Sequence, residues 1–151
     1  MFTKKLFFSF IVLVLISCSG YRLKKEIIYT EGAPKPIGPY SQAVKVGKFI
    51  FISGQIGINP QTGAIEEGLE AQFVRIMENI KNILKEANSD LTKVLKVTLF
   101  LKDLNSFDTI NKLYSNYFTN EFPARETVEV SRLPKDAKVE ISVIAISKDS
   151  R

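Results

Sequence analysis

The sequence of 151 residues contains no histidine and no tryptophan, and its one cysteine is Cys18. Without histidine, neither a Ser-His-Asp nor a Cys-His nucleophile system can be built. Zinc and iron sites that depend on histidine or cysteine are excluded for the same reason. A disulfide within the chain is impossible. Any chemistry must come from Arg, Lys, Asp, Glu, Tyr, Ser, Thr, backbone groups and water.

Metal ions and other cofactors are not expected. A Mg²⁺ or Ca²⁺ site built only from carboxylates stays formally open, but the sequence has no Asp-rich loop of the EF-hand type. Gly-rich loops that cradle phosphates are also missing, because Gly32 and Gly63 are isolated turn glycines.

The charge balance of the chain is weakly positive. The 21 basic and 16 acidic residues give a net charge of +5. Residues 1–17 contain Lys4 and Lys5 and no acid, so the remainder has 21 − 2 = 19 basic and 16 acidic residues, or +3. Because these residues are scattered, nucleic-acid binding is not expected, although weak attraction to anionic surfaces is compatible with them.

The first eighteen residues have the features of an export signal. Lys4 and Lys5 precede an apolar run, residues 6–16, which is broken only by Ser9 and is too short to span a bilayer comfortably. Residues 15–18 (LISC) resemble the bacterial lipobox, in which the cysteine is lipidated and becomes the new N-terminus. We therefore predict a lipoprotein-type signal peptide over residues 1–17, a lipid-attached tether over 18–26 that begins at Cys18, and a folded domain over 27–148.

This start of the chain has two other interpretations. It could form a buried strand or helix around an incidental cysteine, or it could reflect a misplaced start codon. In either case the protein would be cytoplasmic. The anchored interpretation is favoured because the apolar run has no helix caps and no amphipathic period. It places the protein at a membrane, outside the cytoplasm.

The domain alternates between strand and helix patterns. Strands are predicted at residues 25–29, 41–46, 49–56 and 93–101, and two more in the segment from 122 to 146. An apolar stripe predicts a helix over residues 69–87, and Asn105 is the expected N-cap of a second helix that runs to about Phe118. This order predicts an α+β fold in which both helices pack on one face of a mixed sheet.

The last predicted strand is apolar on both faces. One face is formed by Val139, Ile141, Val143 and Ala145, and the other by Glu140, Ser142, Ile144 and Ile146. Because both helices are needed on one face, the second apolar face predicts a partner subunit.

Two charged residues stand out in the C-terminal third. Arg125 follows Pro123 at the start of a strand, and Glu140 interrupts an apolar run. A carboxylate in a buried strand costs several kcal/mol unless it is paired, on the order of the penalties known for buried ions. The two residues could form a purely structural ion pair. If they met at a pocket, they could instead bind an anion and a water molecule.

Two further positions are candidates for a site. Tyr40 follows a proline-stiffened loop, so its phenol should have little freedom, although a tyrosine at the edge of the core is the commoner case. Gly54 interrupts an apolar strand, which indicates either a bulge or a close approach of a ligand to the backbone.

Six short blocks, in order along the chain, resemble the RidA (YjgF) family. They are residues 37–43 (IGPYSQA), 53–56 (SGQI), 100–104 (FLKDL), 122–125 (FPAR), 132–136 (RLPKD) and 139–141 (VEI). The resemblance extends over residues 27–147. It implies a chorismate-mutase-like α+β fold and a homotrimer with three clefts between its subunits. It also implies hydrolysis of 2-iminobutanoate and 2-iminopropanoate to 2-oxo acids and ammonia.

The resemblance also implies roles for individual residues. Arg125 would grip the substrate carboxylate, Glu140 would hold or activate the attacking water, Tyr40 would be the cleft tyrosine and Gly54 would supply a backbone contact. Thr127 stands in the substrate site where the family often has cysteine, so a reactive thiol is absent. Glu126 adds a charge beside the arginine and would weaken the clamp if it turned inward.

This chemistry suits the residues that are present. A guanidinium can bind the carboxylate of an α-imino acid in two places, and water needs only orientation and a mild base to attack a protonated imine. Two alternatives are retained. The protein could be a lipid-anchored binding module that holds a small carboxylate in the same cleft. An endoribonuclease or translation-inhibitor activity ranks last, because the sequence offers no basic stripe with interleaved aromatics.

Overall fold

The computed structural model describes residues 24–148. The predicted signal peptide, residues 1–17, and the predicted lipidation site at Cys18 lie outside this range, so both remain predictions. Within the described range, neither helix combines the length and the apolar character that crossing a membrane requires.

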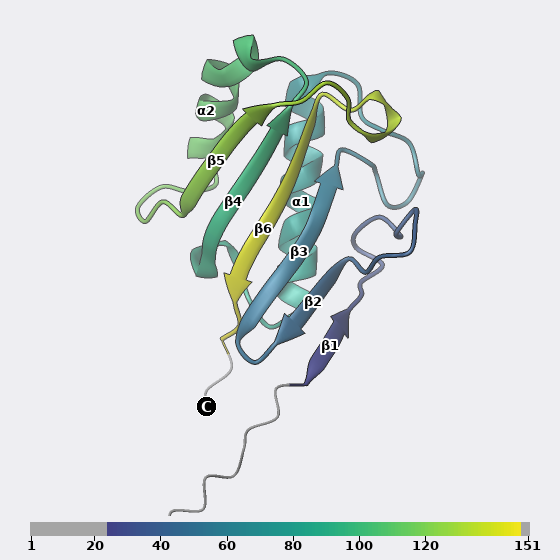
Figure 1. The fold of residues 1–151 in the computed structure, drawn as a ribbon, viewed down its shortest axis with the longest axis vertical. Coiled ribbons are helices and arrows are strands. Elements are labelled where there is room, and N and C mark those ends of the chain that lie inside the picture. The colour runs from purple at the N-terminus through teal and green to yellow at the C-terminus, as the bar shows by residue number, and fades with distance from the viewer. Residues whose placement is uncertain (1–23, 149–151) are drawn as a thin grey trace, which may run out of the picture.

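The described chain forms one six-stranded sheet with two helices (Figure 1). The strand order is β1-β2-β3-β6-β4-β5. Only β4 and β5 are parallel, and the other neighbouring pairs are antiparallel. The strands are β1 (Lys25–Ile28), β2 (Ala43–Val46), β3 (Phe49–Ile56), β4 (Val94–Leu101), β5 (Ala124–Glu129) and β6 (Val139–Ile146), the helices are α1 (Leu69–Glu86) and α2 (Phe107–Ser115), and the 3₁₀ turns are η1 (Leu91–Lys93), η2 (Leu104–Ser106) and η3 (Pro134–Asp136).

Both helices lie on the same face of the sheet, behind it in Figure 1. The stripe predicted for α1 is confirmed, since Phe73, Ile76 and Ile80 are fully buried against the sheet. Each such side chain stabilises the fold by about 1.5–3 kcal/mol relative to an exposed one. The helix ends at Glu86, one residue before the predicted end, and Asn88 follows with a φ of 55°, in the left-handed region that terminates helices. The mixed α+β architecture expected from the sequence is therefore confirmed.

The start of the second helix differs from the prediction. Its N-cap residue is Ser106 rather than Asn105, and it ends at Ser115 rather than near Phe118. The side chain of Asp103 accepts a hydrogen bond of 2.9 Å from the N–H of Asn105. This bond caps η2, the 3₁₀ turn that delays the start of the helix. Asn105 thus donates its backbone N–H to the capping side chain of Asp103 and is not itself the capping residue.

Strand β4 also departs from simple alternation. Alternation along the whole strand would turn Val94 away from Val97 and to the other face, but Val94 is buried and Leu95 is 43% exposed. An irregularity in the pairing of β4 with β6 between Val94 and Lys96 explains the difference. An extra residue in one strand reverses the side-chain alternation on one side of it.

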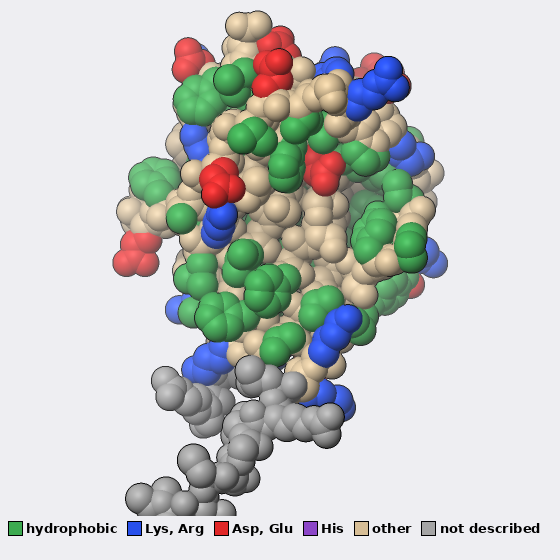
Figure 2. All heavy atoms as spheres, in the orientation of Figure 1, with side chains coloured by type: hydrophobic (Ala, Val, Ile, Leu, Met, Phe, Trp, Pro, Cys, Tyr) green, Lys and Arg blue, Asp and Glu red, His purple; other side chains and the backbone are tan. Residues whose placement is uncertain are grey.

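The sheet face opposite the helices is the one seen in Figure 2, where hydrophobic side chains gather over the lower half. Phe49, Phe51 and Val128 are 51%, 46% and 44% exposed, and Ile144 and Ile146 are half-buried. The second apolar face predicted from β6 is thus present. The partner subunit that we inferred from it stays a prediction.

Candidate functional site

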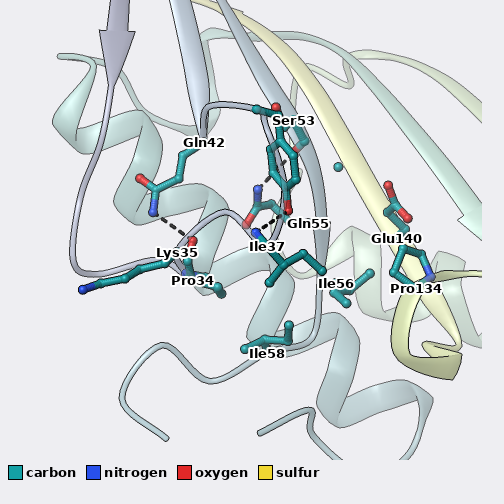
Figure 3. Close-up of a pocket in the computed structure, with 12 residues that line it drawn as sticks. Pro34, Lys35, Ile37, Gln42, Ser53, Gln55, Ile56, Ile58, Pro134 and Glu140 are labelled. Atoms are coloured by element: carbon teal, nitrogen blue, oxygen red, sulfur yellow. Dashed lines mark hydrogen bonds between the residues drawn. The ribbon is translucent and has the colours of Figure 1, made fainter. Parts of the chain in front are cut away.

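A cavity of about 300 Å³ opens at the end of the sheet where β3 ends and β6 begins (Figure 3). Four segments form it: the loop before β2, the second half of β3 with the residues after it, the turn at Pro134, and the start of β6. Most of its walls are apolar. The lining residues used below are Pro34, Ile37, Tyr40, Gly54, Pro134 and Glu140.

Tyr40 is restrained by hydrogen bonds to the loop before it, in agreement with the restricted side chain predicted from the prolines of that loop. The phenol oxygen of Tyr40 accepts a hydrogen bond of 3.2 Å from the N–H of Ile37. A second bond of 2.9 Å joins the N–H of Tyr40 to the carbonyl of Gly38. The side chain is 47% exposed, so the fixed phenol faces open space at the mouth of the cavity.

Gly54 marks a bulge, and it also makes room for Glu140. The pairing of β3 with β6 shifts between Ile52 and Gln55, which confirms the predicted irregularity. A Cβ atom built at Gly54 would overlap Oε1 of Glu140 and lie 2.8 Å from its Cδ. No side chain fits between them, so the carboxyl group lies directly against the backbone of β3.

Burial raises the pKa of Glu140 above its usual value of 4.5. Desolvation is the cause, because water is replaced by the apolar walls of the cavity. A carboxyl group with a raised pKa is a better base once it is ionised than an ordinary surface glutamate. Glu140 is therefore suited to accept a proton inside the cavity.

The turn before β6 carries strain. Lys135 and Asp136 have φ values of 54° and 52°, in the left-handed region that side chains with a Cβ adopt rarely. The 3₁₀ turn η3 lies here, between the last two strands. This turn brings Pro134 to the wall of the cavity shortly before Glu140 enters the sheet (Figure 3).

Arg125 lies elsewhere, beside α2. Its guanidinium donates a hydrogen bond of 2.7 Å to Oδ1 of Asn111. It also lies over two aromatic rings, 5.5 Å from the centre of Phe107 and 4.9 Å from that of Tyr114. Burial raises the pKa of Tyr114 to about 12 although the arginine opposes it, so this phenol stays neutral. The arginine is thus held by one hydrogen bond and two ring faces.

Arg125 and Glu140 do not meet within one chain, contrary to our expectation. Arg125 is paired with Val97, which is buried on the helix side of the sheet. Glu140 is paired with Phe100, whose position in the alternation of β4 faces the other way. The sequence could not reveal this, because the face that each residue occupies depends on the strand to which it is paired. The structural ion pair between them is therefore excluded in the described chain.

The neighbours of Arg125 divide between the two faces. Thr127, two residues on, shares its face, and the Thr127 hydroxyl is buried without a hydrogen-bond partner in the described chain. Glu126 points the other way and forms an ion pair of 2.8 Å with Lys96. Glu126 therefore does not turn inward towards the guanidinium, which was the condition under which it would weaken a carboxylate clamp. A hollow beside Arg125 is lined by Asn111, Tyr114, Ser115, Phe122 and Pro123.

Sequence reasoning missed two residues that shape these places. The contact of Asn111 with Arg125 depends on where α2 lies relative to β5, and no sequence pattern singled Asn111 out. Gln42 was read as part of an alternating strand, whereas it is buried beside the cavity and bonds to the preceding loop. The available signal was a glutamine directly after a proline-rich loop. Over residues 24–148, no three acidic, cysteine or histidine side chains gather in a way that could hold a metal ion.

Several known proteins are similar to this chain in sequence or in structure, and the three described below are each covered to 98% of their own length. The family model described as Endoribonuclease L-PSP matches residues 30–147. A RutC family protein of Pyrococcus abyssi is 58% identical over 124 residues, which cover 82% of this chain and 98% of the relative. The 2-iminobutanoate/2-iminopropanoate deaminase of Salmonella typhimurium is 47% identical over 126 residues, with coverage of 82% and 98%. The crystal structure of the YjgF gene product of E. coli superposes with a TM-score of 0.77 at 46% identity, with coverage of 80% and 98%.

Proposed function

The chain belongs to the RidA (YjgF) family, and on that premise we propose that it is a 2-iminobutanoate/2-iminopropanoate deaminase. Two relatives are named deaminases, the one of Salmonella typhimurium above and a chloroplastic reactive intermediate deaminase of Arabidopsis thaliana. Imine deamination is thus an activity of the family. The proposal for this chain is that it hydrolyses small imino acids to 2-oxo acids and ammonia, without a metal or other cofactor.

One observation carries the proposal: Glu140 lies in a mostly apolar cavity, pressed against the backbone at Gly54, with a raised pKa. A structural glutamate would be expected to have a cationic partner, and the sole cause found for its pKa shift is desolvation. A base in such a place accepts a proton from water more readily than it could in bulk solvent. Tyr40, fixed at the mouth of the cavity, is positioned to contact the substrate.

The reaction needs few groups. The carboxylate of Glu140 accepts a proton from a water molecule as the water oxygen attacks C2 of the protonated imine. The resulting carbinolamine has the former water oxygen and the amino nitrogen on the same carbon. Glu140 then gives its proton to that nitrogen, and the C–N bond breaks and releases ammonia as the hydroxyl oxygen forms the C=O bond of the 2-oxo acid. The hydroxyl proton passes to the Glu140 carboxylate and from there to solvent, which restores the base. Imine and water are consumed, and oxo acid and ammonia are formed, with no change in oxidation state.

The substrate carboxylate needs a cation, and we assign that role to Arg125 of a neighbouring copy. Arg125 and Glu140 lie on opposite faces of one sheet, so one chain cannot offer both to one small molecule. A homotrimer would let the hollow beside Arg125 of one copy face the cavity of the next, with Thr127 beside the arginine. The exposed apolar side chains of the sheet face are consistent with burial between copies.

Hydrolysis of imines formed in situ tests the proposal. An amino-acid oxidase or dehydratase generates the imine, and the loss of imine and the release of 2-oxo acid are followed with residues 19–151. These residues include the whole family region, 30–147, and the relatives above consist almost entirely of that region. Acceleration that is lost in Arg125→Ala is expected. No acceleration by a folded oligomer would refute the proposed activity.

We also propose that Cys18 is lipidated and holds the domain at a membrane outside the cytoplasm. The described chain begins at Lys24 at the end of the sheet opposite the cavity, so an anchor there leaves the cavity open (Figure 1). Incorporation of a labelled fatty acid that Cys18→Ser abolishes is expected. An unlabelled chain found in the cytoplasm would refute the anchor and leave the deaminase proposal intact.

A binding role can be told apart from catalysis with one substitution. Glu140→Gln removes the base and keeps the size of the side chain, so it should abolish hydrolysis and spare binding of a 2-oxo acid. If wild-type protein binds 2-oxobutanoate but does not accelerate hydrolysis, the chain is a carboxylate-binding module. The family description as an endoribonuclease is not carried to this chain, because it has no histidine to assist RNA cleavage.

A further inference from the structure

The loop over residues 30–39 forms one wall of the cavity and has little backbone support of its own. Pro34, Pro36 and Pro39 have no N–H to donate. Two backbone hydrogen bonds lie within residues 30–40. The N–H of Ala33 donates to the carbonyl of Thr30 at 3.5 Å, and the N–H of Tyr40 donates to the carbonyl of Gly38 at 2.9 Å. Buried carbonyls of such a loop need another donor.

The side chain of Gln42 provides that donor. It is 2% exposed, and its Nε2 donates to the carbonyls of Thr30, Ala33 and Pro34 at 3.0, 3.1 and 3.0 Å. Its Oε1 accepts a bond of 2.7 Å from the N–H of Thr30. The bond to Pro34 is visible in Figure 3, where the carboxamide points away from the cavity towards the loop. One carboxamide thus binds both ends of the first half of the loop.

Gln42 also connects the loop to the strand that faces Glu140. Its carbonyl accepts a bond of 3.0 Å from the N–H of Ser53, and the Ser53 hydroxyl donates to the carbonyl of Ser41 at 2.7 Å. Ser53 directly precedes Gly54, against which Glu140 lies. The wall that carries Tyr40 and the strand that carries Gly54 are therefore fixed to each other at residues 41–42.

We propose that Gln42 is a positioning residue, which sets the separation between the Tyr40 wall and the Glu140 carboxyl group. The proposal rests on the deaminase function proposed above. A carboxamide suits this place because the loop presents three carbonyls and one N–H to the same buried group, and an amide offers two N–H donors and an acceptor without carrying a charge. Gln42 acts through the loop and has no role in the proton transfers.

Two variants separate this role from simple packing. Gln42→Ala removes all four bonds, and we expect kcat/KM to fall about 10- to 100-fold, mainly through kcat, because misplacement by about 1 Å costs as much. Gln42→Glu keeps the size and the acceptor for Thr30, but an ionised carboxylate would face three carbonyls. When protonated it can donate again, so its activity relative to wild type should recover in part as the pH falls, whereas that of Gln42→Ala should not.

Ser89→Ala is the matched control. Ser89 is 6% exposed, and its hydroxyl donates a bond of 2.7 Å to the carbonyl of Ile146 at the far end of the sheet. Its removal deletes a buried hydrogen bond without touching the cavity. We expect its thermal stability to fall while kcat and KM stay those of wild type.

Hydrogen exchange of the amides of residues 29–42 completes the test and does not depend on catalysis. Faster exchange in Gln42→Ala than in Ser89→Ala, together with the loss of kcat, would establish the positioning role. Unchanged exchange, or unchanged kcat in a folded Gln42→Ala protein, would overturn it. An inactive wild type would refute the deaminase proposal instead, and the exchange rates would still decide whether Gln42 holds the wall.

Discussion

Two inactive variants should restore activity when they are combined. Arg125→Ala retains Glu140, and Glu140→Gln retains Arg125. Because these residues lie on opposite faces of one sheet, we expect each site to take its arginine from one copy and its glutamate from the next. A mixed oligomer then contains sites in which both donors are intact.

The size of the effect follows from counting. In an equal, random mixture, half of the copies offer an intact arginine and half offer an intact glutamate. About one quarter of the sites in a cyclic oligomer then have both. Each parent should retain about 1% of wild-type activity or less, since a general base alone contributes a factor of about 10²–10⁴. The mixture should therefore exceed its parents about 25-fold or more, on these same figures.

The assay needs mixed oligomers of known composition. The two variants would carry different affinity tags and be co-expressed, and imine hydrolysis would be measured on the unselected random mixture and then on oligomers purified on both tags in turn. In doubly tagged trimers about one site in three, rather than one in four, would have both donors intact. A mixture of wild type with the Arg125→Ala/Glu140→Gln double variant is the control. It should give about one quarter of wild-type activity for a shared site, but about one half if both residues came from one copy. Doubly tagged oligomers no more active than the parents would refute the shared site.

Three other outcomes are expected. Gly54→Ala should lower kcat at least about tenfold, because the new Cβ displaces the Glu140 carboxyl group; a crystal structure of the variant with that group unmoved would contradict this. Burial raises the pKa of Glu140, so activity should rise with pH through a value above 4.5. Glu140→Gln has no carboxyl group to ionise, so it should abolish that rise. Because the ionised form of Glu140 is disfavoured in the fold, the same variant should have a higher melting temperature than wild type above this pH. A lower melting temperature would count against the assigned cause. The pKa of Asp90 is held at about 2, below 3.8, by Lys148 and Thr92, so this pair stabilises the fold above pH 3.8 and ceases to do so as the pH falls towards 2. Asp90→Asn should cost about 1 kcal/mol or less near neutral pH, since the pair is partly exposed, and equal destabilisation at pH 2 and pH 7 in denaturant titrations would argue against the assignment.

The local structure was largely predictable because it depends on short patterns. The apolar stripe of α1 is periodic over five turns, and its termination at Asn88 follows from a residue type that tolerates a positive φ. The structure departs from the simple helix and strand patterns at Asn105 and at Val94. At Asn105 a 3₁₀ turn precedes the helix, and near Val94 an irregularity shifts the pairing of β4 with β6. Such one-residue shifts depend on contacts with the neighbouring strand or helix and leave no periodic signal.

The sequence alone determined which chemistry is available. With no histidine and no cysteine in the family region, any chemistry is left to Arg, Lys, Asp, Glu, Tyr, Ser, Thr, backbone groups and water. The short sequence blocks indicated the family, and the resemblance implied roles for Arg125, Glu140 and Tyr40. The proline-rich loop before Tyr40 also predicted that its side chain has little freedom, and Gly54 indicated an irregularity in its strand.

Only the tertiary structure decided where those groups lie relative to one another. Pairing β5 in parallel to β4 turns Arg125 towards α2, while antiparallel pairing of β6 turns Glu140 to the other face. Side chains alternate along a strand, so the facing of each residue depends on register with a strand distant in the sequence. The same long-range packing buries Gln42 under the loop and lays Glu140 against Gly54. The sequence indicated the candidate groups, and the order and register of the strands placed Arg125 and Glu140 on opposite faces of one sheet.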